Sequence, residues 1–330
     1  MILEWILKSV FILLFMTAGF AYVTLFERRV LARMQVRIGP NRAGPGGILQ
    51  PVADGVKLIF KEELIPADAN KLIFVLAPII TVIPALVITA VIPWGGVVNF
   101  FGRPVALYLS DVNVGVLFIL AVTSISVYGI TLAGWSSNNK YALLGGLRAT
   151  AQMISYELSL GMSFVGPILL AGSMSMLDIV NSQAHMWNIV YQPLGFLIYT
   201  FAGLAEVNRA PFDMPEAEQE LTAGYHVEYS SMKFALFFMA EYIKVIAISM
   251  IGSSLFLGGF HGPFVDQFPW LGPIYLLAKT VLSLFVIVWI RATLPRIRYD
   301  RLMALGWKIM FPLALLNVLV TAVVIILVGG

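Results

Sequence analysis

The amino-acid sequence predicts an all-α integral membrane protein with about eight transmembrane helices. Of its 330 residues, 59% are hydrophobic and only 12% are charged, and the mean hydropathy is +0.89. A soluble domain is usually roughly 45–50% apolar and about 25% charged, so the surplus of apolar surface requires lipid as its solvent. No internal repeat or low-complexity segment divides the sequence, which predicts a single polytopic membrane domain over residues 1–330.

Eight apolar stretches are long enough to cross a hydrocarbon core of ~30 Å, which takes roughly 20 helical residues. The expected spans are residues 3–26, 72–94, 113–135, 149–171, 188–206, 234–257, 274–292 and 308–328. The first stretch could be mistaken for a signal peptide, but it contains Glu4, only one lysine before the apolar run and no small-x-small cleavage site followed by a polar mature start. We therefore expect it to be a retained helix.

Positive charges are concentrated in alternate loops of this arrangement. The loop after the first span contains Arg28, Arg29, Arg33, Arg37, Arg42, Lys57, Lys61 and Lys71. The loops after the third, fifth and seventh spans contain Lys140, Arg148, Arg209, Lys233, Arg296, Arg298 and Arg301. The opposite loops offer little beyond Arg103. By the positive-inside rule the basic loops face the cytoplasm or its equivalent, and both termini lie on the outer side.

The first inner loop has two parts. Residues 37–47 are dense in proline and glycine, which predicts turns. Apolar residues then recur at helical spacing over residues 48–60, with polar residues such as Asp54 and Lys57 on the other faces. This pattern predicts an amphipathic helix that lies along the membrane interface, with an ordinary surface helix as the alternative. Pro51 falls within its first turn, where proline is tolerated.

Charged residues within the spans are candidates for function, since a carboxylate at the bilayer centre costs roughly 2.5–3.5 kcal/mol on insertion scales. Glu157 lies in the fourth span with no cation in the adjacent turns, and burial favours its protonated form. We expect Glu157 to handle protons, the alternative being a neutral carboxyl that only fastens two helices. Glu241 and Lys244 lie three residues apart on one face of the sixth span, so a purely structural ion pair is the alternative there. Lys279, near the start of the seventh span, is expected to snorkel outward.

The loop that follows the fifth span is rich in acidic residues. Residues 206–220 contain five carboxylates and a single arginine, Arg209. Crowded carboxylates repel one another and titrate as a coupled set, which allows them to accept and pass protons. A solvated acidic loop is the alternative, although two prolines and the apolar Phe212 and Met214 favour a structured segment.

The composition excludes several kinds of chemistry. The chain has no cysteine, which excludes disulfides, iron–sulfur ligation and a thiol nucleophile. Its histidines, His185, His226 and His261, are far apart and none lies in an H-E-x-x-H pattern, so no metal site is expected. There is no Walker lysine loop or nucleotide-binding glycine fingerprint, and a net charge of +3 is too small to indicate nucleic-acid binding. We expect no redox centre on this chain.

Six segments carry a resemblance to one known family. They are FERRVLARMQVRIGPNRAGP at 26–45, QPVADGVKLIFKE at 50–62, LRATAQMISYE at 147–157, NRAPFDMPEAE at 208–218, VEYSSMKFALFFMAEY at 227–242 and RATLPRIRYD at 291–300. On these segments, which run from the first span to the start of the eighth, the chain resembles the quinone-channel membrane subunit of proton-translocating NADH:quinone oxidoreductase, respiratory complex I. Val207 departs from the pattern, because the family commonly has threonine there, and the missing hydroxyl alters a local hydrogen bond.

The resemblance implies a quinone tunnel built from the inner loops and a proton path that leaves it. By motif position Glu27 and Arg28 are expected near the tunnel entrance, and Asp54, Arg209 and Asp213 in its charged middle. The remaining acidic residues are expected to form a funnel and a path toward neighbouring membrane subunits: Glu206, Glu216, Glu218 and Glu228 in the funnel, then Glu157 and Glu241. The residue patterns alone indicate Glu157, Glu206, Glu241 and the acidic loop, but not Glu27, Arg28 or Glu228.

The resemblance also implies the surroundings of the chain. The expected partners are the iron–sulfur and quinone-site subunits of a redox arm and a series of antiporter-like membrane subunits. Quinone is the expected substrate, and the iron–sulfur clusters and flavin belong to the partners. The expected location is the bacterial inner membrane, with the mitochondrial inner membrane as the alternative.

Three other functions are compatible with parts of the sequence. Membrane-bound hydrogenases and related dehydrogenases use a similar subunit, although the intact 208–218 motif favours a quinone-linked complex. A stand-alone ion transporter would suit Glu157 and Glu241, but the absent repeat and the long inner loops argue against it. A structural membrane scaffold is the remaining alternative.

Overall fold

A computed structural model describes residues 2–100, 103–214, 222–265 and 267–329. Within this part of the chain seven helices are long and apolar enough to span a membrane, which confirms the predicted all-α membrane class. They are α1 (Ile2–Met34), α3 (Lys71–Ile88), α4 (Gly115–Ser136), α5 (Lys140–Ala171), α10 (Ser231–Phe256), α11 (Gly272–Thr293) and the C-terminal helix. That last helix consists of α12 (Tyr299–Leu305), a π-helical turn (Gly306–Met310) and α13 (Phe311–Gly329).

The fifth predicted span is shorter than the others. Residues 188–206 form a four-residue helix, α7 (Asn188–Tyr191), followed by α8 (Pro193–Glu206), because proline starts a new helix at its first turn. The 14 residues of α8 measure about 21 Å at 1.5 Å per residue, less than the ~30 Å hydrocarbon core. The chain therefore leaves helical geometry at Val207 while it is still surrounded by the other helices.

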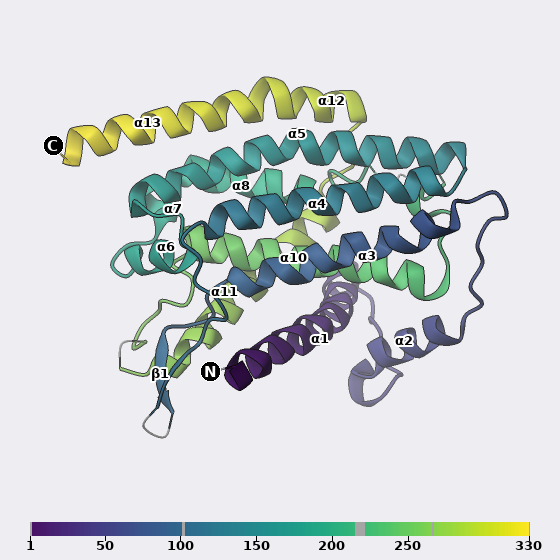
Figure 1. The fold of residues 1–330 in the computed structure, drawn as a ribbon, viewed down its shortest axis with the longest axis horizontal. Coiled ribbons are helices and arrows are strands. Elements are labelled where there is room, and N and C mark those ends of the chain that lie inside the picture. The colour runs from purple at the N-terminus through teal and green to yellow at the C-terminus, as the bar shows by residue number, and fades with distance from the viewer. Residues whose placement is uncertain (1, 101–102, 215–221, 266, 330) are drawn as a thin grey trace.

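The helices lie roughly parallel, and the two termini lie at the same end of the bundle (Figure 1). We call this the terminal end, and the end that carries residues 35–70 and 222–230 the loop end. α3 packs on α4, α4 on α5, and α5 on α8, while α10 runs through the middle. The most apolar window of α10 is 67% buried, against 22% for α1, α11 and the C-terminal helix. Polar side chains on α10 are therefore shielded by protein rather than by lipid.

Small residues allow the central helices to approach closely. A Cβ added to Gly129 of α4 would lie 2.1 Å from Thr81 Oγ1 on α3. A Cβ added to Gly134 would lie 2.6 Å from the carbonyl oxygen of Ala142 on α5. Such close packing is typical of membrane helices, which gain little from apolar burial between them.

The loops contain both predicted and unpredicted structure. The predicted amphipathic helix is present as α2 (Gln50–Phe60) and lies at the loop end. The connection between α3 and α4 contains a hairpin that the sequence patterns do not predict, β1 (Val97–Phe100) and β2 (Arg103–Ala106), paired from Val97–Ala106 to Phe100–Arg103. Four-residue strands are too short to produce a clear alternating pattern. Shorter connectors are the 3-10 turns at Pro45–Gly47, Thr89–Val91, Gly224–His226 and Pro269–Leu271, and α6 (Met176–Ser182).

Candidate functional site

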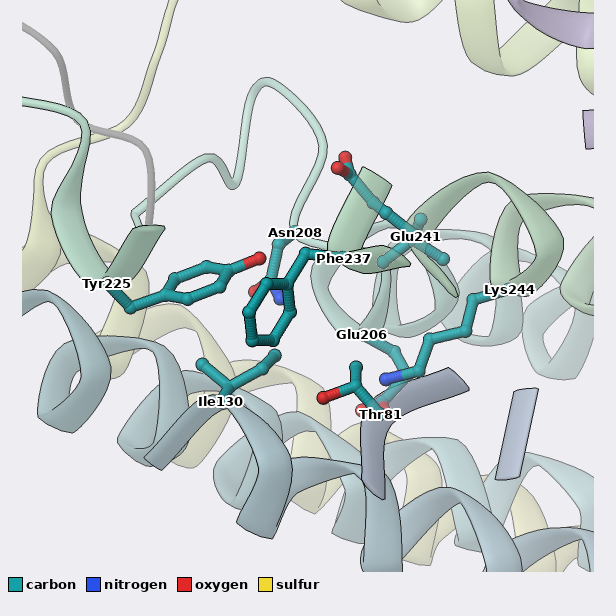
Figure 2. Close-up of a pocket in the computed structure, with 9 residues that line it drawn as sticks. Thr81, Ile130, Glu206, Asn208, Tyr225, Phe237, Glu241 and Lys244 are labelled. Atoms are coloured by element: carbon teal, nitrogen blue, oxygen red, sulfur yellow. The ribbon is translucent and has the colours of Figure 1, made fainter. Parts of the chain in front are cut away.

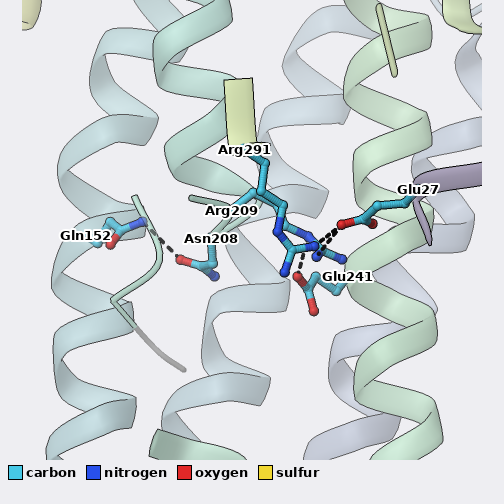
Figure 3. Close-up of polar contacts among 6 residues, drawn as sticks. All are labelled: Glu27, Gln152, Asn208, Arg209, Glu241 and Arg291. Atoms are coloured by element: carbon cyan, nitrogen blue, oxygen red, sulfur yellow. Dashed lines mark hydrogen bonds and ion pairs between the residues drawn. The ribbon is translucent and has the colours of Figure 1, made fainter. Parts of the chain in front are cut away.

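Two glutamates and two arginines from four separate segments meet inside the loop end of the bundle (Figure 3). Arg209, just after α8, places Nε 2.7 Å from Glu241 Oε1 of α10 and Nη1 3.6 Å from Glu27 Oε1 of α1. Arg291 of α11 pairs with the same oxygen of Glu27. The side chains of Glu27 and Arg209 are only 7% and 6% exposed. This set, called the Arg209 cluster below, therefore joins α1, α10, α11 and the segment after α8 through buried charges.

An aromatic ring supports the central arginine of the Arg209 cluster. The guanidinium of Arg209 lies over the ring of Tyr242 at 4.3 Å from its centroid, a distance at which cation–π attraction is effective. Removing one partner of such a buried ionic group leaves an uncompensated charge, which costs about 3–5 kcal/mol. The position of Arg209 is consequently fixed by three neighbours, and small displacements change its distances to both carboxylates.

A second buried charged group lies next to the first, in a small cavity (Figure 2). Glu206, the last residue of α8, is 1% exposed, and neither of its carboxylate oxygens has a hydrogen-bond partner among the described residues. Lys244 of α10 is 5% exposed, and its ammonium points toward Glu206 and Thr81. The cavity beside them has a volume of ≈ 20 Å³, the size of about one water molecule.

Glu157 extends this second group toward α4 and α5. Its carboxylate accepts a hydrogen bond from Ser124 on α4. The charges of Glu157 and Lys244 both act on Glu206, and those of Glu206, Glu157 and Glu241 all act on Lys244. Glu157, Glu206, Lys244 and Glu241 thus form one electrostatically connected row, which continues into the Arg209 cluster through the ion pair of Glu241.

The sequence spacing allows an ion pair between Glu241 and Lys244, but Glu241 pairs with Arg209 instead. The two residues are three positions apart on α10, but their side chains point in different directions (Figure 2). Glu241 forms its ion pair with Arg209, whereas Lys244 faces Glu206. The alternative of a closed, purely structural pair within α10 is therefore wrong, because tertiary neighbours supply better-placed partners on both sides.

An apolar cavity lies beside α1, α2 and the start of α10. Its volume is ≈ 330 Å³, and its walls include Phe20, Met232, Phe234, Phe238 and Met239. Thr24, Arg28, Asp54 and Lys57 form the polar part of the lining, with Arg28 Nη1 2.7 Å from Asp54 Oδ2. Gln50 also donates to Asp54, at 3.1 Å. The cavity combines an aromatic and methionine-rich wall with one ion pair, a composition typical of sites for largely apolar ligands.

The structure groups the first five predicted channel residues differently from their expected order. Glu27 lies with Arg209 in the interior, while its neighbour Arg28 turns to Asp54 at the cavity, because successive helical residues point about 100° apart. Asp213 lies in the same turn-containing segment as Arg209 and is partly buried. Glu216 and Glu218 lie outside the described residues.

Glu228 is separate from the buried row. It accepts a hydrogen bond of 2.7 Å from Asn139, the N-cap residue of α5, and lines a surface pocket with Asp68 and Lys140. The next residue, Tyr229, stacks on Phe74 with ring centroids 4.0 Å apart and donates a hydrogen bond to the Phe74 carbonyl. Burial raises the pKa of Tyr229 to about 12, so the phenol remains a neutral donor. This part of the loop end fastens the segment before α10 to α3.

Several residues of the site are not indicated by sequence patterns. Arg291 and Tyr242 lie within the segments that carry the family resemblance, but Arg291 is at the end of a span, where arginine is common, and Tyr242 is an uncharged aromatic residue within one. Gln152 of α5 is 0% exposed and donates hydrogen bonds to Ala205 in the last turn of α8 and to Phe212 after it. An amide in an apolar span is the available signal for Gln152, since buried polar groups are almost always hydrogen-bonded. Over residues 2–100, 103–214, 222–265 and 267–329, no three His, Asp or Glu side chains are arranged to hold a metal ion.

Comparison with known proteins gives a consistent result over nearly the whole chain. The sequence profile of the family described as NADH dehydrogenase matches residues 7–322. An NADH-quinone oxidoreductase H subunit of Geobacter metallireducens is 53% identical over 307 residues, which are 93% of this chain and 92% of that protein. The corresponding protein of Thermomicrobium roseum is 51% identical over 95% of this chain and 94% of its own length. Another, from Geobacter sulfurreducens, is 48% identical over 98% of this chain and 95% of its own.

Proposed function

Since the chain belongs to the NADH dehydrogenase family, as the H-type membrane subunit of NADH-quinone oxidoreductase, or complex I, we propose that it forms the membrane wall of the quinone channel and couples quinone reduction to proton movement. The observation that carries the proposal is the row of buried and partly buried charges from Glu27 through Arg209, Glu241 and Lys244 to Glu206 and Glu157. This row begins one residue from Arg28, which lines the apolar cavity.

The apolar cavity is suited to the quinone tail. Its phenylalanine and methionine walls offer dispersion contacts to an isoprenoid chain, and methionine adapts readily to irregular shapes. The Arg28–Asp54 pair supplies hydrogen-bonding groups on the wall past which a polar headgroup would move. The cavity is bordered by α1, α2 and α10, so a quinone would enter beside the amphipathic helix rather than through the lipid-facing side of α5.

Reduction of the quinone creates a demand for protons in this region. The reaction takes up two electrons and two protons to give the quinol, and the electrons are supplied by a partner subunit. A negative charge that forms near Arg209 before protonation acts strongly on buried carboxylates, because charges interact over longer distances in a low dielectric. We expect protons to redistribute among Glu241, Glu206 and Glu157, with Lys244 as the intervening cation.

The rest of the machinery belongs to other subunits. The chain has no cysteine for an iron–sulfur cluster, so the clusters and the flavin are assigned to the redox arm. Glu157 and Ser124 lie on the α4–α5 side of the row, and we expect the antiporter-like membrane subunits to receive the protonation signal there. The chain would lie in the bacterial inner membrane with both termini, which share one end of the bundle, on the outer side.

The substitution Glu157→Gln tests the proposal, since it removes the charge at the end of the row while keeping the size of the side chain. We expect the complex to assemble and its redox arm to reduce an artificial acceptor normally. Proton pumping and quinone-linked turnover should both fall, by roughly tenfold if the carboxylate is obligatory. Pumping is measured in proteoliposomes containing the purified complex. Normal pumping by a fully assembled variant would remove Glu157 from the pathway.

A further inference from the structure

The segment that carries Arg209 is an irregular turn inside the bundle. At the end of α8, residues 205–212 reverse direction, with Asn208 in the left-handed region at φ 56°. Val207 and Phe212 are 3% and 0% exposed, so the turn is buried on the side facing the core. Its backbone makes local hydrogen bonds, such as Phe212 N–H to Arg209 O at 2.8 Å, and accepts one from a distant residue, Ile297 N–H to Pro211 O at 3.1 Å. These bonds tie the turn to the segment before α12, so its attachment to α5 must come from side chains.

Gln152 supplies this connection. Its Nε2 donates to the carbonyl oxygens of Ala205 at 2.8 Å and Phe212 at 2.7 Å, the two ends of the turn. It also lies 3.2 Å from Asn208 Oδ1, at the middle of the turn (Figure 3). An amide nitrogen has two hydrogens, so three acceptors around it use its full donor capacity. The single side chain thus holds both ends and the centre of the segment to α5.

The three acceptors around Nε2 explain why an amide donor is needed at position 152. All three partners of Nε2 are oxygens, so a rotated amide would set its own oxygen against two backbone carbonyls. A carboxylate would be repelled in the same way, and an apolar side chain would leave the Ala205 and Phe212 carbonyls with only their backbone donors, Asn208 N–H and Met214 N–H, and remove the tie to α5. Gln152 is 0% exposed, so water cannot take over the role without a rearrangement.

We propose that Gln152 is a positioning residue for the quinone-linked reaction, whose amide holds residues 205–212 in the register that directs Arg209 between Glu27 and Glu241. The inference rests on the proposed function of the Arg209 cluster. Asn208 is hydrogen-bonded by Gln152, and Arg209 follows it immediately with its guanidinium on the opposite side of the turn (Figure 3). Displacement by an ångström at this turn changes both ion-pair distances, an error large enough to reduce a rate by about a hundredfold in other sites.

A merely structural glutamine offers the matched control. Gln183 is also 0% exposed and ties α6 to the end of α10, donating to Ser254 O at 2.8 Å and accepting from Gly258 N–H at 2.9 Å. These hydrogen bonds lie away from the Arg209 cluster. Gln152→Met and Gln183→Met therefore remove similar hydrogen bonds, and only the first should affect the charged site.

The experiment is a double-mutant cycle in the whole complex, combining each glutamine variant with Glu241→Gln. For Gln152→Met we expect a roughly tenfold lower kcat for quinone reduction, with normal electron transfer to an artificial acceptor. Glu241→Gln should lower kcat as well, and the double variant should be little slower than the slower single variant, because Arg209 is already displaced from Glu241. When Gln183→Met is combined with Glu241→Gln, the factors by which the two substitutions lower kcat should multiply.

Each outcome has a distinct meaning. If Glu241→Gln alone leaves quinone turnover normal, the proposed function of the Arg209 cluster fails. If Glu241→Gln lowers turnover but Gln152→Met does not, the positioning role of Gln152 is wrong and the proposed function of the Arg209 cluster is retained. The same conclusion follows if the reductions in kcat caused by Gln152→Met and Glu241→Gln multiply in the double variant, as they do for the Gln183 control. Should Gln152→Met fail to assemble, Asn208→Gly provides the second variant, since glycine accepts the positive φ and removes the side-chain contacts with Gln152 and Met153 while both carbonyl contacts of Gln152 remain. Asn208→Gly should lower kcat by about twofold to threefold, and its effect should not multiply with that of Glu241→Gln in the double variant. Multiplicative reductions in kcat would overturn the inference.

Discussion

The two ends of the helical bundle bury polar side chains in opposite ways. At the terminal end the fully buried ones are neutral: Asn317 donates to Gln192 at 2.8 Å, and Gln192 donates to Thr321 at 2.5 Å. These contacts connect α13 to the start of α8 through complementary amides and hydroxyls. At the loop end charged groups are buried as well as neutral ones such as Gln152, and the charged groups come from α1, α5, α8, α10, α11 and the turn after α8.

The degree of hydrogen-bond satisfaction separates the Gln192 network from the charged groups of the loop end. In the Gln192 network each amide has a partner of the opposite kind, as buried polar groups normally do. Among the described residues, both oxygens of Glu206 and Nη2 of Arg209 have none. A satisfied neutral network holds helices in one arrangement, whereas an incompletely satisfied charged network responds to any charge that appears beside it. The comparison indicates a fixed terminal end and a responsive loop end.

The largest expected effect comes from removing the centre of the charged network. Arg209→Met leaves Glu27 and Glu241 without their shared cation, and breaking a buried ionic group costs about 3–5 kcal/mol. We expect quinone-linked turnover of the assembled complex to fall by about a hundredfold, because displacing a group of the site by an ångström can cost that factor in rate. The measurement is quinone reduction by the purified complex, normalised to electron transfer from NADH to an artificial acceptor.

Arg209→Lys separates the charge from its geometry. Lysine retains the positive charge but cannot face two carboxylates with a planar fork, so an intermediate rate is expected. If Arg209→Met were as active as the unmodified complex, the function of the loop end would not depend on its buried charges. The proposed difference between the two ends would then be wrong.

A smaller effect of another kind is expected at the terminal end. Gln192→Met removes the donor to Thr321 and the acceptor of Asn317, leaving a buried amide without its partner, which costs about 1–3 kcal/mol. The melting temperature of the assembled complex should fall, while turnover per assembled complex should stay within about twofold. Thermal unfolding followed together with activity makes the measurement. A variant with normal stability but reduced pumping would place function at the terminal end as well.

The sequence predicts which residues are chemically unusual better than it predicts their neighbours. Seven of the expected spans appear as long apolar helices, and Glu157, Glu206 and Glu241 are all close to the interior charged row. Hydropathy identifies such residues because an ionisable group in an apolar helix is costly wherever it points.

Hydropathy does not predict which of these residues form ion pairs with one another, because ion pairing depends on how the helices rotate and pack. Glu27 and Arg28 are adjacent in the sequence, yet one joins the Arg209 cluster and the other lines the apolar cavity. The pair suggested by the i, i+3 spacing of Glu241 and Lys244 is replaced by tertiary partners. Gln152 has no charge to attract notice, and its significance follows only from the turn that it reaches.

The smallest expected effect tests whether burial, rather than charge alone, distinguishes the loop end. Arg28 and Asp54 also form an ion pair there, but the Arg28 side chain is 47% exposed and the pair lines the cavity proposed for quinone. Solvent-exposed pairs contribute about 0–1 kcal/mol to stability, so Arg28→Ala should leave assembly intact. If the pair contacts quinone during entry, the KM for a short-chain quinone should rise about threefold while kcat is preserved. Steady-state kinetics over a range of quinone concentrations gives both constants. A fall in kcat comparable to that of Arg209→Met would mean that exposed and buried charges act as one network, and that burial does not set the Arg209 cluster apart.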